Sequence, residues 1–399
     1  MSDGSHPSRA PLVFASLGHI YVHCFTAFYF VIVLAVEVDW QRPYHELISL
    51  WTLGAALVGA GALPAGWLAD RFSPNGMMVI YFLGLGGSAI AAGLTGSSSG
   101  LLLALAGIGL FASIYHPVGI PWLIRNAPVA SRGRVLAVNG VFGGIGSAGA
   151  GLAAGFLIDF SGWRSAFIMP GVIAVLTGLA LAWTLRGARS SSGAAAAQEE
   201  SKPGTSEMLR VFCILVFTMF VGGIIAHCVQ TVLPKTFEQR AAQLVGEGAL
   251  GVGVLVAIVY GIAGLMQLVG GYLADRLAWK HVYLGGFLFQ VPLLWLVASL
   301  AGLPLVATVT LATMASMAAL PAENLLLARY SPANRQGLVF GVKFVLAFGS
   351  APIAVFLVSQ ITGRTDGFYW VYAPLAALAL AITLAAAFLP SRAASTSIA

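Results

Sequence analysis

Long apolar runs constrain this chain more than any other feature of its sequence. Each run has about twenty residues or more, the length that a helix needs to cross about 30 Å of hydrocarbon. Charged residues make up only 9% of the 399-residue chain, against about 25% in a typical soluble domain, so there are too few polar side chains to cover a soluble surface. We therefore expect an all-α membrane protein with twelve transmembrane helices, near residues 11–36, 47–69, 76–96, 99–124, 135–158, 164–185, 209–233, 248–274, 282–301, 304–328, 337–361 and 367–389.

A charged hexamer at the end of the second run indicates that the chain is a duplication. Gly66-Trp67-Leu68-Ala69-Asp70-Arg71 returns nearly unchanged, 205 positions later, as Gly271-Tyr272-Leu273-Ala274-Asp275-Arg276. Further residues recur at a spacing of 204: His23 and His227, Cys24 and Cys228, Pro117 and Pro321, Arg125 and Arg329, and Gly133 and Gly337. The shared spacing predicts two pseudo-symmetric six-helix halves, an arrangement that places a site at the interface between the repeats.

A polar segment separates the sixth run from the seventh. It contains Ser190-Ser191-Ser192-Gly193, a stretch of alanine, and Gln198-Glu199-Glu200-Ser201-Lys202-Pro203-Gly204. Such a segment has no apolar face to bury and is typical of a flexible linker. We expect an N-terminal half at 1–189, a cytoplasmic linker at 190–207 and a C-terminal half at 208–399.

The distribution of lysine and arginine predicts the orientation of the chain in the membrane. With the N-terminus inside, fourteen of the 20 basic residues fall in cytoplasmic segments, five fall outside, and Lys343 alone lies within a span. Basic residues are enriched in cytoplasmic loops, so we expect both termini in the cytoplasm. We also expect the protein to lie in the inner membrane of a bacterial cell and to be a monomer. The net charge of +6 is therefore interpreted as an orientation signal for the lipid bilayer, with no nucleic acid as partner.

The repeated hexamer resembles the loop motif of the major facilitator superfamily, which has the form G-x-L-a-D-R-x-G-R-R/K between spans 2 and 3 and is often echoed between spans 8 and 9. The matching residues are Gly66, Leu68, Asp70 and Arg71, and then Gly271, Leu273, Asp275 and Arg276. Phe72-Ser73-Pro74-Asn75 replaces the end of the first copy. The resemblance covers essentially the whole chain. It implies a secondary transporter, with no enzyme activity and no cofactor, that rocks two halves around a central cavity.

A narrower resemblance concerns spans 1, 4 and 5. Span 1 and the string Tyr115-His116-Pro117 in span 4 resemble the fosmidomycin-resistance-type efflux branch, which has a His-x-x-x-Asp string in span 1 and a Phe-His-Pro string in span 4. Here His23 stands where that branch has aspartate. Span 5 is similar to the antiporter glycine motif, with Ile145 in place of the usual proline; its glycines are Gly140, Gly144 and Gly149. This resemblance implies efflux by antiport.

The two copies of the hexamer carry the candidate cytoplasmic gate. An aspartate at this position can hold a neighbouring helix N-terminus or pair with an arginine in one access state only. The alternative is a solvated loop charge. The candidate gate residues are Gly66, Asp70, Arg71, Gly271, Asp275 and Arg276.

Glu323 and Lys343 are the strongest internal signal. Counted from the basic ends of their spans, at ~1.5 Å per residue, both lie roughly 9–12 Å deep. A charge at mid-membrane costs about 2.5–3.5 kcal/mol on insertion scales, so such groups pair or face a wet cavity. We expect the pair to bind an anionic substrate or a coupling proton; the alternative is a permanent salt bridge that only stabilises the second half.

Histidines form a second set of candidates. His19 and His23 are four residues apart and share one helical face, and His116 precedes Pro117, where a helix bends or loses a hydrogen bond. In the family that the chain resembles, spans 1, 4, 7 and 10 line the cavity, which would bring His23, His116 and His227 together. Histidine suits proton coupling or a weak anion site, although packing is the alternative for any single one. Further intramembrane candidates are Asn139 and Gln230.

These features together predict proton-coupled transport of a small anionic or amphiphilic organic solute, with export favoured. No nucleotide-binding loop of the form G-x-x-x-x-G-K occurs, so transport driven by ATP is not expected. Two alternatives stay open. One is an importer of a soft metal ion such as copper, with His23, Cys24, His227 and Cys228 as ligands. The other is a non-transporting sensor with the same fold.

Overall fold

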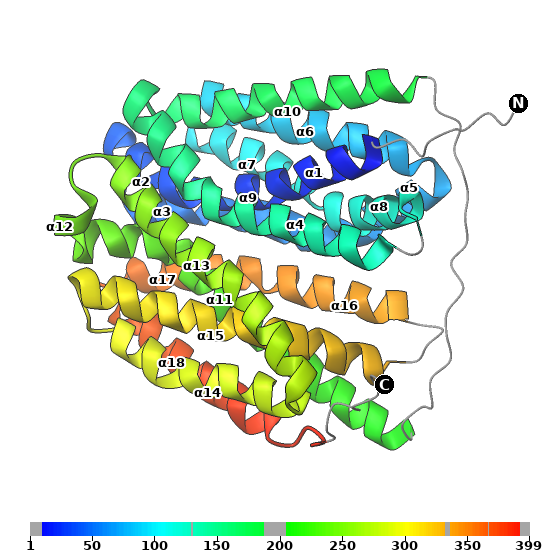
Figure 1. Ribbon diagram of the computed structural model, residues 1–399. Helices are drawn as coiled ribbons and strands as arrows, with labels where there is room; N and C mark the ends of the chain where they lie inside the picture. Colours follow the sequence, from blue (N-terminus) through cyan, green and yellow to red (C-terminus); the bar gives the residue numbers. More distant parts are fainter. Residues whose placement is uncertain (1–9, 129–130, 187–204, 332–335, 366, 392–399) are drawn as a thin grey trace, which may run out of the picture.

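The computed structural model describes residues 10–128, 131–186, 205–331, 336–365 and 367–391, and their regular secondary structure is helical throughout (Figure 1). The expected linker lies almost entirely outside these residues. The first half contains α1 (Ala10–Ala27), α2 (Tyr29–Trp40), α3 (Tyr44–Ser49), α4 (Trp51–Ala60), α5 (Ala62–Arg71), α6 (Pro74–Leu94), α7 (Ser98–Ala112), the π-helix η1 (Tyr115–Gly119), α8 (Ile120–Asn126), α9 (Arg132–Ser161) and α10 (Trp163–Leu185). The second half contains α11 (Thr205–Arg240), α12 (Ala242–Val245), α13 (Ala249–Arg276), α14 (Trp279–Val297), α15 (Gly302–Arg329), α16 (Gln336–Gly349), α17 (Ala351–Thr362) and α18 (Tyr369–Ala386).

The number of membrane spans agrees with the sequence. Among the described residues, eleven helices are long and apolar enough to cross a membrane, and the bent pair Tyr44–Ala60 and Ala62–Arg71 brings the number to twelve. The expectation of an all-α membrane protein with twelve spans is therefore confirmed. In Figure 1 the helices of the first half lie above those of the second, with α11 running through the middle of the view.

Several spans are interrupted, and the sequence predicted one of these interruptions, the one at Pro117. The second span bends by 42° at Gly61, between α4 and α5. The fourth span passes through η1, which contains Pro117. Proline has no N–H to donate and its ring crowds the preceding turn, so the helix widens there to a π-turn. These interruptions matter for function because η1 carries His116.

Glycines allow two helices of opposite halves to touch along their backbones. A Cβ on Gly253 of α13 would stand 2.2 Å from the carbonyl oxygen of Gly151 on α9. A Cβ on Gly155 would stand 2.6 Å from the carbonyl oxygen of Ala249. Only glycine fits at such distances, and close backbone contact of this kind is a main source of helix association within a membrane.

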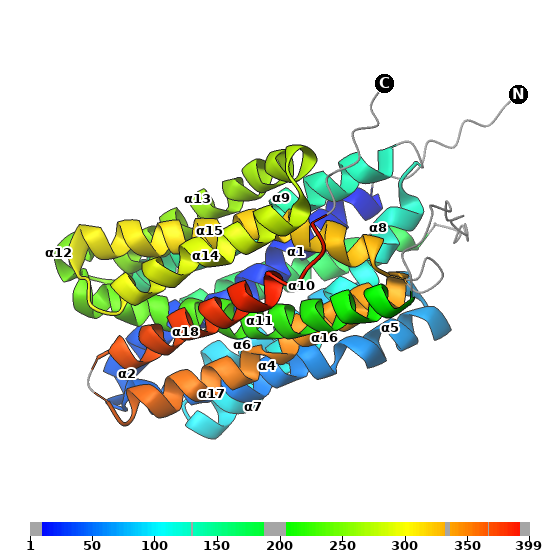
Figure 2. The same ribbon diagram turned by 90° about the horizontal axis from the view of Figure 1, so that it is seen from below.

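The two halves are joined firmly at one end of the bundle, which we call the Glu37 end; α2 and α12 lie there in both views (Figures 1 and 2). Lys235 Nζ of α11 donates to Glu37 Oε2 of α2 at 2.7 Å. The Tyr44 hydroxyl donates to the carbonyl oxygen of Thr231 at 3.0 Å. Asp159 of α9 accepts hydrogen bonds from the first backbone N–H groups of α13, at 2.8 and 2.9 Å. The Glu37 end is therefore closed by contacts between the halves.

The opposite end, which we call the Asp70 end, has polar contacts of a different kind. Asp70 lies 3.4 Å from Arg125, and both belong to the first half. Lys280 Nζ donates to the carbonyl oxygen of Ala387 at 2.6 Å, and both belong to the second half. These contacts stabilise each half separately. The conformer in the structure is thus one whose halves are tied together at the Glu37 end.

Candidate functional site

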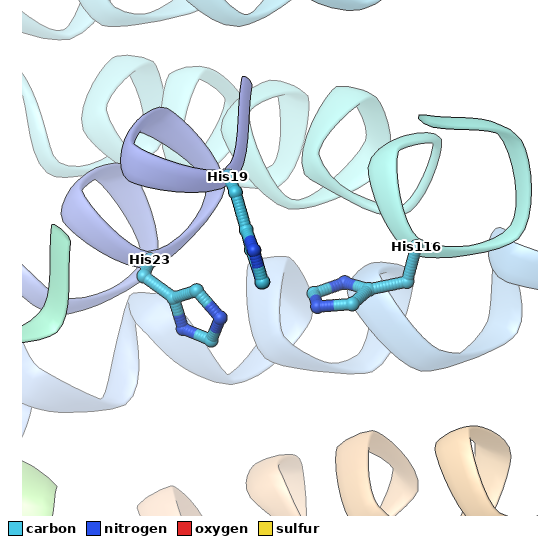
Figure 3. A group of neighbouring side chains, drawn as sticks. All are labelled: His19, His23 and His116. Carbon is cyan, nitrogen blue, oxygen red and sulfur yellow. The ribbon is translucent and has the colours of Figure 1, made fainter. Parts of the chain in front are cut away.

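Three histidines from two helices meet in the first half, and we call them the histidine cluster: His19 and His23 on α1, and His116 on η1 (Figure 3). The ring centroids of His19 and His23 lie 5.0 Å apart, and each lies 5.6 Å from the ring of His116. One ring nitrogen of each histidine lies within 4.8 Å of the others. Spacing by four residues brings the first two onto one face of α1, and the π-turn around Pro117 carries the third.

His19 is held in place by a group of buried polar side chains. Its Nδ1 lies 2.7 Å from the carbonyl oxygen of Asn139, and its ring stacks on Tyr115 at 5.0 Å with an interplanar angle of 24°. The Tyr115 hydroxyl donates to the carbonyl oxygen of Ala15 at 2.7 Å and accepts from Asn139 Nδ2 at 3.0 Å. Because a carbonyl oxygen only accepts, Nδ1 of His19 carries a proton, and in the neutral imidazole the other ring nitrogen then holds the lone pair.

The histidine cluster lies at the boundary with the second half. The ring of His116 contacts Phe348 of α16 at a centroid distance of 4.9 Å. His227 of α11 contacts the residue of α16 that precedes Phe348. The Nε2 atom of His227 lies 3.1 Å from the carbonyl oxygen of Ala347, and Gln230 lies beside His227 on the same helix. The structure thus brings His19, His23, His116 and His227 to one region, from both halves.

A charged cluster occupies the second half, and we call it the Lys343 cluster. Lys343 Nζ donates to Glu323 Oε1 and to Asn324 Oδ1, each at 2.6 Å. The side chains of Lys343 and Glu323 are only 13% and 7% exposed. The Tyr283 hydroxyl lies 3.2 Å from the other oxygen of Glu323 and 2.8 Å from Thr218 Oγ1. The ion pair joins α15 and α16, and the hydrogen bonds of Tyr283 extend the cluster to α14 and α11. The two charges are thus paired, as is usual for charged groups inside a membrane.

The candidate gate residues lie at the Asp70 end. Arg71 stands over the ring of Trp67 at 5.7 Å and Arg276 over the ring of Tyr272 at 4.1 Å, so each arginine packs on its own helix. Asp70 and Arg125 form an exposed ion pair at 3.4 Å. The two glycines, Gly66 and Gly271, lie in α5 and α13, where Gly271 has open space beside it. Asp275 is the last residue but one of α13 and is followed by Arg276, which ends the helix.

The cysteines do not gather with the histidines of the proposed metal set. The Cys228 thiol is buried and donates to the carbonyl oxygen of Ala354 at 3.8 Å, toward α17. The group of metal-ligating side chains found among the described residues consists of His19, His23 and His116, and Cys24 is not one of its members.

Several residues of these clusters were not expected from the sequence. Tyr283, Thr218 and Phe348 lie in apolar runs, where tyrosine, threonine and phenylalanine usually serve packing, so the sequence carries no signal for them. Tyr115 adjoins the His-Pro dipeptide and could have been found from that. The ion pair between Glu37 and Lys235 could have been found by searching for charges at the ends of spans on the same side of the membrane.

A helical membrane protein with two halves and buried charged groups near their interface has the architecture of a secondary transporter. The chain belongs to the Major Facilitator Superfamily, whose family model matches residues 15–342. This confirms the superfamily resemblance drawn from the repeated hexamer. The efflux branch within it stays a prediction.

Individual relatives are transporters, and two of them are named for small organic solutes. The 4-hydroxybenzoate transporter PcaK of Pseudomonas putida is 27% identical over 341 residues, which cover 74% of this chain and 73% of that protein. The niacin transporter NiaP of Acinetobacter baylyi is 32% identical over 147 residues, which cover 34% of this chain and 31% of that protein. A crystal structure of a bacterial homologue of the human lysosomal transporter Spinster, in an inward-facing conformation, matches with a TM-score of 0.76 at 16% identity, over 97% of both chains. The protein is thus a multi-pass secondary transporter of this superfamily; its relatives and its fold are those of transporters and not of enzymes.

Proposed function

We propose that this transporter moves a small organic anion together with a proton, and that the Lys343 cluster binds both. The observation that carries the proposal is the buried ion pair, in which Lys343 Nζ lies 2.6 Å from Glu323 Oε1. A carboxylate solute can replace Glu323 as the partner of Lys343 if Glu323 takes up a proton. The cluster then keeps the same net charge in its empty and loaded states, and no unpaired charge is left buried.

The direction of transport follows from this charge balance. If the anion entered without a proton, the buried cluster would carry an extra negative charge, which costs several kcal/mol in a low-dielectric site. Anion and proton therefore bind together, which favours co-transport over the antiport implied by the resemblance in span 5. With the proton gradient directed inward, co-transport produces uptake. Export by exchange is the rival outcome that the flux assay distinguishes.

The chemical class of the solute is supported by two features. The relatives are named for 4-hydroxybenzoate and niacin, each an aromatic ring with a carboxylate. At the boundary between the halves, Phe348 of α16 and the ring of His116 lie close together, and an aromatic solute can stack on such rings. Lys343 would hold the carboxylate, and the rings near the histidine cluster would hold the apolar part. His227 and Gln230 are further candidates for polar contacts to the solute.

The proposed placement is the bacterial inner membrane with both termini in the cytoplasm, on the basis of the lysine and arginine distribution. In this orientation the Asp70 end faces the cytoplasm, the Glu37 end faces outward, and the conformer described above faces inward. The proposal also retains the division into halves at 1–189 and 208–399. Fusion of a reporter that fluoresces only in the cytoplasm to the C-terminus tests the orientation; a dark, fully translated fusion would contradict it.

The central experiment measures solute flux in proteoliposomes. We expect labelled 4-hydroxybenzoate or niacin to accumulate when the outside is made acidic, and a protonophore to abolish accumulation. One proton per monovalent anion makes the cycle electroneutral, so an imposed potassium diffusion potential should leave the rate unchanged. Flux that ignores the pH gradient removes the coupling claim, and accumulation driven by an acidic interior would show exchange instead.

Two substitutions separate binding from coupling. Lys343→Ala should abolish both binding and flux. Glu323→Gln should keep exchange of labelled for unlabelled solute but lose accumulation driven by the pH gradient, because glutamine is neutral and does not release a proton. Lys280→Ala is the matched control, since Lys280 lies half-buried at the Asp70 end and bonds only a backbone carbonyl among the described residues. Unchanged flux in both site variants would overturn the assignment.

A further inference from the structure

The histidine cluster has a geometry that transport of an organic anion does not require. Three imidazoles come from two helices, and one ring nitrogen of each lies within 4.8 Å of the others. Two of them are four residues apart on α1, so both project from one helical face. Two of the three side chains are half-buried and His116 is buried, so the cluster is shielded and still borders the interface between the halves.

The nitrogens of the cluster are close to the spacing of a metal site. A tetrahedral zinc ion binds imidazole nitrogen at about 2.0–2.1 Å, which places the ligand nitrogens about 3.3 Å from one another. Moving from 4.8 Å to that spacing needs a shift of roughly an ångström by each ring, which rotation of the side chains supplies.

The surroundings of His19 match those of a metal ligand. Its Nδ1 donates to the carbonyl oxygen of Asn139 at 2.7 Å, which leaves the lone pair on Nε2. Metal-binding histidines commonly use the second ring nitrogen in this way, and the contact fixes the tautomer and orients the ring. Tyr115 stacks on this ring and holds the Asn139 side chain, so the support is itself anchored.

We propose that His19, His23 and His116 form a binding site for one divalent transition-metal ion of the zinc class. Three neutral imidazoles suit Zn²⁺, Co²⁺, Ni²⁺ or Cu²⁺ and disfavour Mg²⁺ and Ca²⁺, which prefer oxygen ligands. The fourth coordination position has no protein ligand among the described residues of the cluster and is open to water or to a carboxylate. The site is separate from the Lys343 cluster, although it shares the ring of His116 with the aromatic surface proposed for the solute.

Metal binding by the purified full-length protein tests the proposal. The protein is prepared with an affinity tag that contains no histidine and is stripped with a chelator; Zn²⁺ alone is then titrated by calorimetry, and Co²⁺ alone is followed by its visible absorption. We expect one equivalent of either metal per chain, and a Co²⁺ spectrum of the intense kind that tetrahedral coordination produces. Calcium and magnesium at the same concentrations should produce no binding signal.

Variants assign the ligands. His19→Ala, His23→Ala and His116→Ala should each weaken Zn²⁺ binding by at least about 100-fold. Tyr115→Phe leaves the three imidazoles in place and removes the hydroxyl that bonds Asn139 and Ala15, so it should weaken binding by about 10-fold. The matched controls are His281→Ala, at an exposed position of α14, and His227→Ala, which lies near the cluster without belonging to it. Both controls should bind like the wild type. Thermal unfolding of each variant without metal shows that the fold is intact.

Three results would overturn the site: the absence of stoichiometric binding to the wild-type protein, unchanged Zn²⁺ affinity in the three cluster variants, or equal loss of affinity in the His227 and His281 controls. Because no organic solute is present in the titration, the result is independent of the flux assay, and either proposal can fail while the other stands.

Discussion

The two halves of the protein place different chemistry on the same helical frame. Asn139 in the first half occupies the position that Lys343 occupies in the second, at the repeat spacing of 204, and Gly119 occupies the position of Glu323. In the first half Asn139 bonds Tyr115 and supports the histidine cluster. In the second half Lys343 bonds Glu323. Duplication thus preserved the packing of the helices and left each half free to acquire its own polar residues.

The backbone contacts of the histidines show how closely the packing was preserved. His19 lies 2.7 Å from the carbonyl oxygen of Asn139, and His227 lies 3.1 Å from that of Ala347; each pair is 120 residues apart. The second contact is displaced along the helices by four residues, which is about one turn. The α1–α9 and α11–α16 interfaces therefore present a carbonyl oxygen to a histidine in both halves, at different depths.

The largest expected effect comes from breaking the ion pair of the second half. Lys343→Ala leaves Glu323 buried without its cation and should destabilise the protein by about 3–5 kcal/mol. Adding Glu323→Gln to Lys343→Ala should recover part of this loss, because the unpaired charge is then removed. Thermal unfolding in detergent measures the stability of the single and the double variant. A Lys343→Ala protein as stable as the wild type would contradict the pairing.

A smaller effect is expected from the equivalent position of the first half. Asn139→Ala removes the hydrogen bond to the Tyr115 hydroxyl but exposes no unpaired charge, so the loss should be about 1–3 kcal/mol. Tyr115→Phe is the comparison, because it removes the same bond from the other side together with the bond from the hydroxyl to the carbonyl oxygen of Ala15. Thermal unfolding of both variants sharpens the comparison; a loss as large as that of Lys343→Ala would show that the halves are less different than their charges suggest.

The contacts at the Glu37 end predict a change in conformation. Lys235→Ala removes the bond to Glu37 that joins the halves, and the population open at this end should rise several-fold. Spin labels placed on the ends of α2 and α12 measure this as a longer distance. The control is Arg42→Ala, whose partner Glu46 lies in the same half. Equal distance distributions in Lys235→Ala and the wild type would remove the gating role.

The smallest effect on stability is expected at the Asp70 end, although the effect on transport should be clear. The pair between Asp70 and Arg125 is exposed, so Asp70→Asn should change stability by less than ~0.5 kcal/mol. As a gate element, the same variant should slow transport several-fold in the flux assay. Asp275→Asn should slow it less, because no ion pair joins Asp275 to Arg329, the repeat partner of Arg125, in the described part of the chain. Transport by Asp70→Asn at the wild-type rate would contradict the gate role, and Asp70 would then be a solvated loop charge.

Much of the fold and part of the candidate site followed from local sequence patterns. Runs of about twenty apolar residues are sufficient to place membrane helices, because the thickness of the hydrocarbon sets their length. The pairing of Glu323 with Lys343 was also expected, because two opposite charges at equal depth in adjacent spans have few other partners. The bend at Gly61 was not predicted, and at Pro117 the sequence predicted a bend or a lost hydrogen bond but not the π-turn. Glycine and proline permit such features, but packing against neighbouring helices decides which of them form.

The sequence by itself determined that this protein is a membrane-spanning duplication of the major facilitator type, with charged and imidazole groups inside the membrane. Hydrophobicity, repeat spacing and charge asymmetry are properties of the chain alone, so no structure was needed for them. Only the tertiary structure decided which polar groups meet: His116 with His19 and His23, His19 with the backbone of Asn139, and Glu37 with Lys235 across the halves. These contacts join residues far apart in the chain, and their distances depend on how whole helices pack, which no local pattern specifies.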